Sequence, residues 1–323
     1  MKKLSIIDAA FLMMESRETP MHVGTFNLFT LPEGADEQEF LHDLADGMRT
    51  ADALQSPFGE KLKVGWRGML GPLYWEEDTS LDLEYHIRHS ALPKPGRFRE
   101  LFALVSRLHG TLLDRNRPLW EMHLIEGLQD RQFAVYAKFH HAAIDGVRSS
   151  HILQSMWSTN PNERIHYSPL SMSARDRYLA SLGVNAPGEQ ELRKVAEALK
   201  ATFDSSANVL GALRKDVGAW TDSGSALVVP WQKVPRSVIN TRVDGARRFV
   251  AQSWPFARIR AVGKALDGTF NDAVLTMCAG ALRTFLLNHG ELPRESLKSM
   301  VPVSLRKPGD MDSSNAVGAI SAD

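Results

Sequence analysis

Two adjacent histidines, His140 and His141, are followed by three small or apolar residues and then by Asp145 and Gly146. Neighbouring side chains of an extended segment point to opposite faces, so only one of the two histidines can face a given pocket. An imidazole, with an ordinary pKa near 6.5, suits a general base that takes the proton of an attacking hydroxyl and passes it to a departing thiolate. We expect Asp145 to hold the loop and Gly146 to allow a tight turn beside a ligand.

Two other interpretations of these histidines stay open. Histidines at the end of a strand often do no more than satisfy backbone groups. They can also bind a metal, but no further cluster of His or Cys lies nearby, so no metal site is predicted. The sequence has no Gly-x-Ser-x-Gly elbow and no phosphate-binding glycine motif, and its one cysteine, Cys278, falls in an apolar helical pattern typical of a core. We therefore expect no covalent acyl-enzyme.

The elements around the histidines come from hydrophobic periodicity. Residues 133–139 read as a strand and residues 146–157 as a helix, so the histidines lie between a strand and a helix, where rigid elements hold both sides of a loop. Upstream, the pattern predicts helices over 6–15, 36–49 with Asp36 as N-cap, and 97–114; strands over 21–31, 83–89 and 122–125; a turn at 129–131; and a glycine-rich loop over 59–71.

The length of 323 residues suggests two domains. We assign residues 1–165 to a first α/β domain with the histidine motif, and residues 166–245, rich in loop residues and with a helix over 189–217, to a connection. Residues 246–323 form a second α/β segment with strands over 249–254, 297–305 and 316–321 and helices over 257–266 and 271–288. Its sheet is unfinished at residue 323, so the second domain is expected to be incomplete, and a second chain is one way to complete it.

Formal net charge is zero, which argues against a nucleic-acid partner. A basic cluster at Arg242, Arg247 and Arg248 favours a solvated loop over contact with an anionic cofactor. A single cysteine fits a reducing compartment, and neither a signal peptide nor an apolar run of spanning length is recognisable. These features predict a cytoplasmic protein that still has the option of resting on a lipid surface.

The string His-His-x-x-x-Asp-Gly at residues 140–146 resembles the hallmark of the bacterial wax ester synthase/diacylglycerol acyltransferases. That family belongs to the coenzyme A-dependent acyltransferase superfamily, with chloramphenicol acetyltransferase and peptide-synthetase condensation domains. Further blocks similar to the family run along the chain: residues 11–12, Glu15, residues 20–24, 89–96, 113–121 with Pro-Leu-Trp, Asn271-Asp272, and residues 301–306 and 315–318.

The resemblance implies an α/β fold with two chloramphenicol-acetyltransferase-like domains, each a mixed sheet flanked by helices, and a tunnel between them. It implies that His141 is the base, that His140 supports it, and that Asp145 is structural. Asn271 and Asp272 are the candidate substrate-binding pair. Asn271 is expected either to donate a hydrogen bond to the substrate or the oxyanion, or to act as an N-cap. For Asp272 a structural role is favoured. Trp120 is either a packing anchor or part of the lining of an acyl channel.

The implied reaction moves a fatty acyl group from acyl-CoA to a long-chain alcohol or to diacylglycerol by direct attack. No cofactor is expected, because acyl-CoA is a substrate. The water-insoluble acceptors imply a protein held peripherally on a membrane or on lipid droplets. Two alternatives stay open: a superfamily acyltransferase with another alcohol or amine as acceptor, and a non-catalytic lipid-binding or droplet protein.

Overall fold

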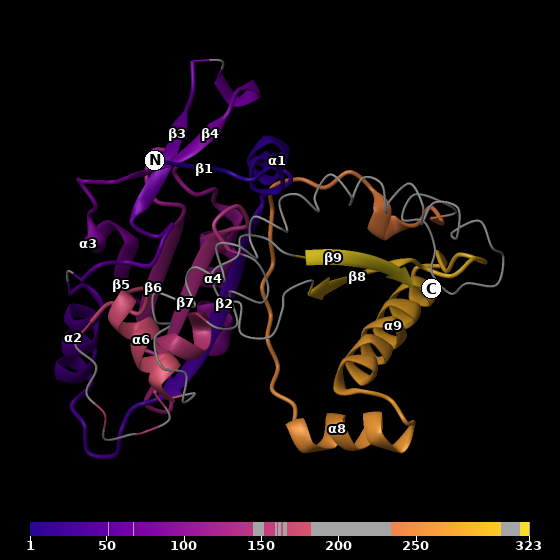
Figure 1. The fold of residues 1–323 in the computed structure, drawn as a ribbon. Helices are drawn as coiled ribbons and strands as arrows, with labels where there is room; N and C mark the ends of the chain where they lie inside the picture. The colour runs from indigo at the N-terminus through magenta and orange to yellow at the C-terminus, as the bar shows by residue number, and fades with distance from the viewer. Residues whose placement is uncertain are drawn as a thin grey trace. The chain divides into compact units, whose positions relative to one another are not determined.

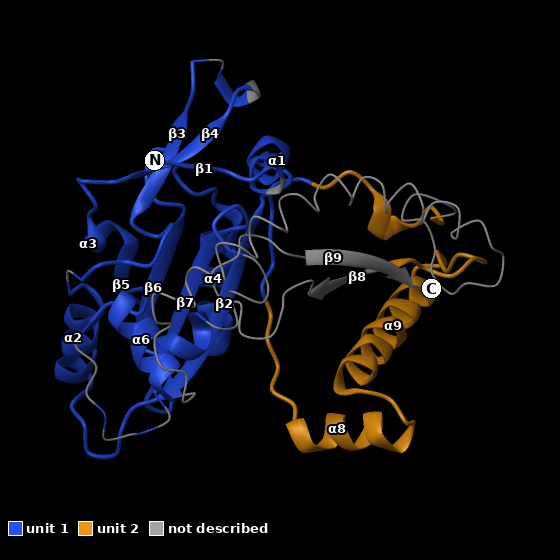
Figure 2. Cartoon of the chain, in the orientation of Figure 1, with its two compact units in different colours: residues 1–204, 244–249, 304–317 blue, residues 205–243, 250–303, 318–323 orange. Residues whose placement is uncertain are grey.

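A computed structural model describes residues 1–50, 52–66, 68–144, 152–158, 160, 163, 167–181, 234–304 and 317–322. The chain divides into two compact units (Figure 2). Unit 1 holds residues 1–204, 244–249 and 304–317, and unit 2 holds residues 205–243, 250–303 and 318–323. Asp145, Gly146 and the helix expected over 189–217 lie outside the described residues, as does the first part of the helix expected from residue 146.

The main sheet of unit 1 has four strands in the order β2-β7-β6-β5 (Figure 1). They are β2 (His22–Thr30), β7 (Gln132–His140), β6 (Trp120–Glu126) and β5 (Ile87–Ala91). β7 pairs antiparallel with β2 and β6, whereas β5 pairs parallel with β6. Asp130 and Arg131 adopt positive φ between β6 and β7, which confirms the predicted turn.

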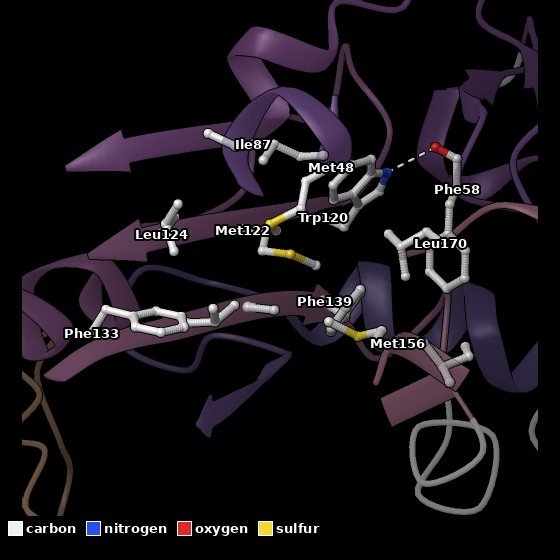
Figure 3. Close-up of a cluster of buried hydrophobic side chains, with 14 of the residues drawn as sticks. Met48, Phe58, Ile87, Trp120, Met122, Leu124, Phe133, Phe139, Met156 and Leu170 are labelled. Atoms are coloured by element: carbon white, nitrogen blue, oxygen red, sulfur yellow. Dashed lines mark hydrogen bonds between the residues drawn. The ribbon is translucent and has the colours of Figure 1, made fainter. Parts of the chain in front are cut away.

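Helices cover both faces of this sheet, because alternate residues of a strand point to opposite sides. The odd-numbered residues from 133 to 139 pack in one core cluster with α2 (Glu37–Met48). Figure 3 draws this cluster, with Met48 of α2 and with Phe133 and Phe139 labelled. Asp36 caps α2 as predicted. Ala134 and Tyr136 pack in another cluster with α4 (Phe98–Gly110). The predicted mixed sheet flanked by helices is confirmed for unit 1, whose last described helix is α6 (Met172–Ser181).

A smaller sheet of unit 1 has the order β1-β4-β3, with β1 (Lys2–Lys3), β4 (Leu73–Glu77) and β3 (Glu60–Val64). Beside it lies α1 (Ile6–Met14), which begins at Ser5, where the hydroxyl accepts the Asp8 N–H. Leu12 of α1 packs in one cluster with Trp75 of β4 and with Ala142 and Ala143. α1 and the β3–β4 hairpin are therefore built against the turn that follows the two histidines.

Two predictions about unit 1 are wrong. The loop expected over 59–71 contains β3 and the 3-10 turn η1 (Gly68–Leu70), because its glycines lie around a hairpin and only Leu62 of its strand reaches a core. The strand expected over 83–89 opens as a helical turn, α3 (Leu83–His86), because the Asp82 carboxylate accepts the N–H groups of Glu84 and Tyr85.

Unit 2 contains η2 (Val238–Asn240), α8 (Phe256–Ala265), α9 (Phe270–Asn288) and most of a two-stranded sheet of β8 (Ser299–Ser304) and β9 (Val317–Ala322). Cys278 lies on α9 but is exposed, so its predicted core position is wrong. The strand expected over 249–254 is also wrong. Phe249 belongs to unit 1, where its ring packs against Phe26 and Phe102 and its N–H donates to the Ser106 hydroxyl instead of to a strand partner.

Candidate active site

His140 is the last residue of β7 and its side chain is fully buried. The Ala142 N–H donates to His140 Nδ1 at 3.0 Å. A backbone N–H can only donate, so Nδ1 is the acceptor and the neutral ring carries its hydrogen on Nε2. Nε2 lies 3.4 Å from Oε1 of Glu15. His140 is therefore locked in one tautomer and orientation, which is a supporting role.

Glu15 follows α1 directly, and its side chain is only 1% exposed. Besides facing His140, its carboxylate accepts the Met21 N–H at 3.1 Å and a guanidinium N–H of Arg115 at 3.0 Å. Burial by itself raises the pKa of Glu15, but the interactions of its carboxylate with His140, the Met21 N–H and Arg115 outweigh burial and lower that pKa to about 2. A buried carboxylate thus joins α1, the start of β2 and the end of β7.

Arg115 completes this cluster from the segment between α4 and β6. Its guanidinium also donates to the carbonyl of Leu12 at 2.7 Å, one of the orphan carbonyls in the last turn of α1. A cation at this end of a helix also meets the negative end of the helix dipole. Arg115 therefore fixes both the end of α1 and the carboxylate that faces His140.

His141 lies one residue beyond β7 and is only partly buried. Its N–H donates to the Met21 carbonyl at 2.8 Å, which continues the pairing of β7 with β2. Its ring stacks on Phe11 of α1, with 4.3 Å between ring centroids and 16° between ring planes. The two histidines thus differ as expected of neighbours: one ring is sealed in the core and the other is held at its rim.

A buried ion pair fixes the strand just before the histidines. The Nζ of Lys138, a fully buried residue, lies 2.6 Å from Oε1 of Glu121 and donates to the carbonyls of Leu108 and Thr111 at 2.8 and 2.7 Å. Burial raises the pKa of Glu121. The charges and hydrogen bonds of His123 and Lys138 outweigh this effect and lower the pKa to about 2. This pair attaches the end of α4 to β6 and β7.

Trp120 lies in the core of unit 1, 1% exposed. Its Nε1–H donates to the carbonyl of Phe58 at 2.8 Å (Figure 3). Its own carbonyl accepts a hydrogen bond from His86 Nδ1 at 2.7 Å, and the two rings are stacked. This is the environment of a packing anchor. A role for Trp120 in lining an acyl channel stays a prediction.

Asn271 and Asp272 both lie in the first turn of α9 in unit 2 and are exposed. The N-cap is Thr269, so the N-cap alternative for Asn271 is wrong. Thr269 donates its N–H and its hydroxyl to the Asp272 carboxylate and accepts the Asp272 N–H in a capping box. These bonds lower the pKa of Asp272. The Asn271 side chain stays a candidate donor to substrate.

Residues 4–274 match the family model for the wax ester synthase/diacylglycerol acyltransferase catalytic domain. The chain belongs to this family. A probable diacylglycerol O-acyltransferase of Mycobacterium tuberculosis is 41% identical over 97% of this chain and 66% of its own length. An O-acyltransferase of Acinetobacter baylyi is 37% identical over 100% of this chain and 67% of its own length.

Solved structures agree with this family assignment. The wax ester synthase/diacylglycerol acyltransferase of Marinobacter aquaeolei VT8 matches with a TM-score of 0.66 and 38% identity, over 92% of this chain and 64% of that one. The first condensation domain of the CDA synthetase matches with a TM-score of 0.55 and 15% identity, over 99% of this chain and 68% of that one, which shows the fold alone. The chain spans 66% of the length of the first mycobacterial relatives.

Family membership confirms the resemblance read from the His-His-x-x-x-Asp-Gly string. The roles of the individual residues stay predictions, including that of Asp145 and Gly146. In the sequence, Glu15 belongs to a block that matches the family, and no local pattern predicts a role for it. Its partners Arg115 and His140 are 100 and 125 residues away, so no local spacing connects them. The available signal is a carboxylate that directly follows a helix whose other residues, apart from Asp8, are apolar.

Proposed function

We propose that this chain carries the acyl-transfer site of an O-acyltransferase that moves a fatty acyl group from acyl-CoA to a long-chain alcohol or diacylglycerol. The observation that carries the proposal is that the two histidines differ in burial and in the contacts that hold them. His140 is buried and locked by Ala142 and Glu15, whereas His141 is pinned through its backbone and keeps part of its surface at the rim of the core. The names of its relatives supply the acceptor class.

In the proposed step, His141 takes the proton of the acceptor hydroxyl while the hydroxyl oxygen bonds to the thioester carbonyl carbon. The carbon–sulfur bond then breaks, and the thiolate of coenzyme A takes the proton from His141. The products are an ester and free coenzyme A, with no acyl-enzyme. Phe11 restrains the imidazole plane, which supports this role because an oriented base reduces the entropic part of the barrier.

The proposed setting is a lipid surface, since both acceptors are insoluble in water. None of the described helices has the length and apolar character needed to cross a membrane. Peripheral attachment to a membrane or a lipid droplet is therefore the form of association that we propose.

The test compares His141→Ala with His42→Ala, an exposed histidine on α2 far along the chain from the motif. The full chain is given palmitoyl-CoA, and thiol release is followed with and without hexadecanol or diacylglycerol. We expect acceptor-dependent release that falls by about 10² or more in His141→Ala and is unchanged in His42→Ala. Release that survives in His141→Ala removes that residue as the base, and no release from the folded wild type favours a binding protein.

A further inference from the structure

The outward side of α1 is apolar. Ile6 is 90% exposed, Met13 52% and Met14 54%, and the only polar residue within the helix, Asp8, is buried. A helix at the surface of a globular protein normally turns charged and polar side chains to water. α1 presents methionine and isoleucine there instead, while its inner side supplies Leu12 to a core cluster.

The outer end of the β3–β4 hairpin is apolar too. The hairpin projects from the rest of unit 1, with η1 at its tip (Figure 1). Trp66 beside this turn is 91% exposed, and Val64 at the end of β3 is 43% exposed. Met69 of the turn packs in the same cluster as Leu12 of α1. The apolar surfaces of the helix and of the hairpin tip therefore belong to one packed substructure.

Charges at this end are mainly positive. Lys2 and Lys3 of β1 are exposed and pair with Trp75 and Tyr74 of β4. No Asp or Glu occurs between residues 61 and 75. Lys63 pairs with Glu76, while Glu60 and Glu77 face each other at the far end of the β3–β4 ladder. The hairpin and the neighbouring strand β1 thus combine an exposed indole, aliphatic side chains and lysines, the composition that attaches proteins to anionic lipid.

We propose that the docking surface of Ile6, Met13, Met14, Val64 and Trp66 attaches the protein to an anionic phospholipid surface. The indole lies at the depth of the headgroups, the aliphatic side chains reach the acyl chains, and Lys2 and Lys3 meet lipid phosphates. The inference deepens and rests on the proposed function, because it explains how an insoluble acceptor arrives. Phe11, on another side of α1, contacts the His141 ring, so one short helix separates the lipid from the proposed base.

Vesicle sedimentation tests the inference with the full chain and vesicles of phosphatidylcholine with and without phosphatidylglycerol. Trp66→Ser and the double variant Ile6→Ser/Met13→Ser are compared with Trp254→Ser, a 51% exposed tryptophan outside the docking surface. We expect the first two to lower the partition constant by about tenfold or more, because each removes large apolar groups from lipid. Trp254→Ser leaves it within about twofold. Lys2→Gln and Lys3→Gln each lower binding to anionic vesicles by roughly fivefold.

Equal binding by wild type and docking-surface variants overturns the inference. So does a wild-type dimer that Trp66→Ser dissociates while vesicle binding persists, since the surface is then an interface between two copies. Quenching by bromine-labelled lipid provides a second measurement, and a signal that persists in Trp66→Phe argues against insertion of Trp66. Activity on a short, water-soluble alcohol separates the two proposals. Vesicle binding without transferase activity refutes the proposed function only, and transferase activity without vesicle binding refutes the docking inference only.

Discussion

Replacing Glu15 by glutamine tests whether the buried carboxylate holds the site together. The variant keeps the size of the side chain but removes the charge that faces Arg115 and His140 and places an NH₂ group among donors. The folded-state pKa of Glu15 is about 2, against an ordinary value of 4.5. This difference corresponds to about 3 kcal/mol of stability at neutral pH, at about 1.4 kcal/mol per pKa unit. The side chain is almost fully buried, so solvent screens little of it.

The sign of the pH dependence follows from the lowered pKa. Stability from Glu15 is fully present above pH 4.5 and is lost as the pH falls toward 2, because the folded state resists protonation. Wild type and Glu15→Gln should therefore differ by about 3 kcal/mol in the free energy of unfolding at pH 7 and converge in acid. Urea unfolding from pH 7 to pH 3 measures this, with the exposed Glu77→Gln as control.

A difference below about 0.5 kcal/mol at pH 7 would refute the reasoning, since surface substitutions commonly reach that size. An unchanged gap between wild type and variant across the acid range would refute it as well. The loss would then come from packing and not from the charge. Thiol release per folded molecule adds an independent reading, because a His140 freed from Glu15 no longer anchors the turn that carries His141.

Two further predictions concern buried charge. Lys138→Met removes the nearest cation of Glu121 and leaves Arg88 at 3.8 Å, so it should cost about 3 kcal/mol, and Glu121→Leu added to it should restore much of the loss in urea unfolding. A double variant no more stable than Lys138→Met would contradict this. Burial lowers the pKa of His22 to about 4, despite its bond to the His109 carbonyl. Wild type should therefore lose stability as the pH falls from 6.5 to 4, and His22→Gln should lose less; parallel curves would argue against this.

The regular elements of unit 1 could largely be predicted because their patterns are local. β7 alternates between two cores, α4 repeats its apolar residues at helical spacing, and Asp36 caps α2, all within a few residues of sequence. The errors arise where a partner is distant or where local capping prevails. β3 has few apolar residues and is a strand because β4 pairs with it. Phe249 is apolar but packs against two phenylalanines instead of joining a sheet.

In the candidate site, too, some features could be predicted from local sequence and others could not. The two histidines are visible as a motif, and the rule of opposite faces predicts that only one is available to a substrate. The sequence does not reveal which contacts bury His140 and leave His141 partly exposed. Ala142 fixes the tautomer of His140, and the carboxylate that faces it arrives from residue 15 with an arginine from residue 115. Such contacts depend on chain topology, which no spacing between neighbouring residues encodes.

α1 lies between the two histidines and the proposed docking surface. Its end supplies Glu15 to the buried histidine, one of its sides supplies Phe11 to the partly exposed histidine, and its outer side forms part of the proposed docking surface. A helix of nine residues is too short to be stable alone in water, so its position depends on Arg115 and on the cluster it shares with β4. α1 contacts the His141 ring through Phe11, and Glu15 directly after α1 faces the His140 ring. A displacement of α1 on lipid would therefore change the contacts of both rings. Substitutions that loosen it should therefore impair the orientation of His141 before they unfold the main sheet, whose two cores are formed mainly by α2, α4 and the strands.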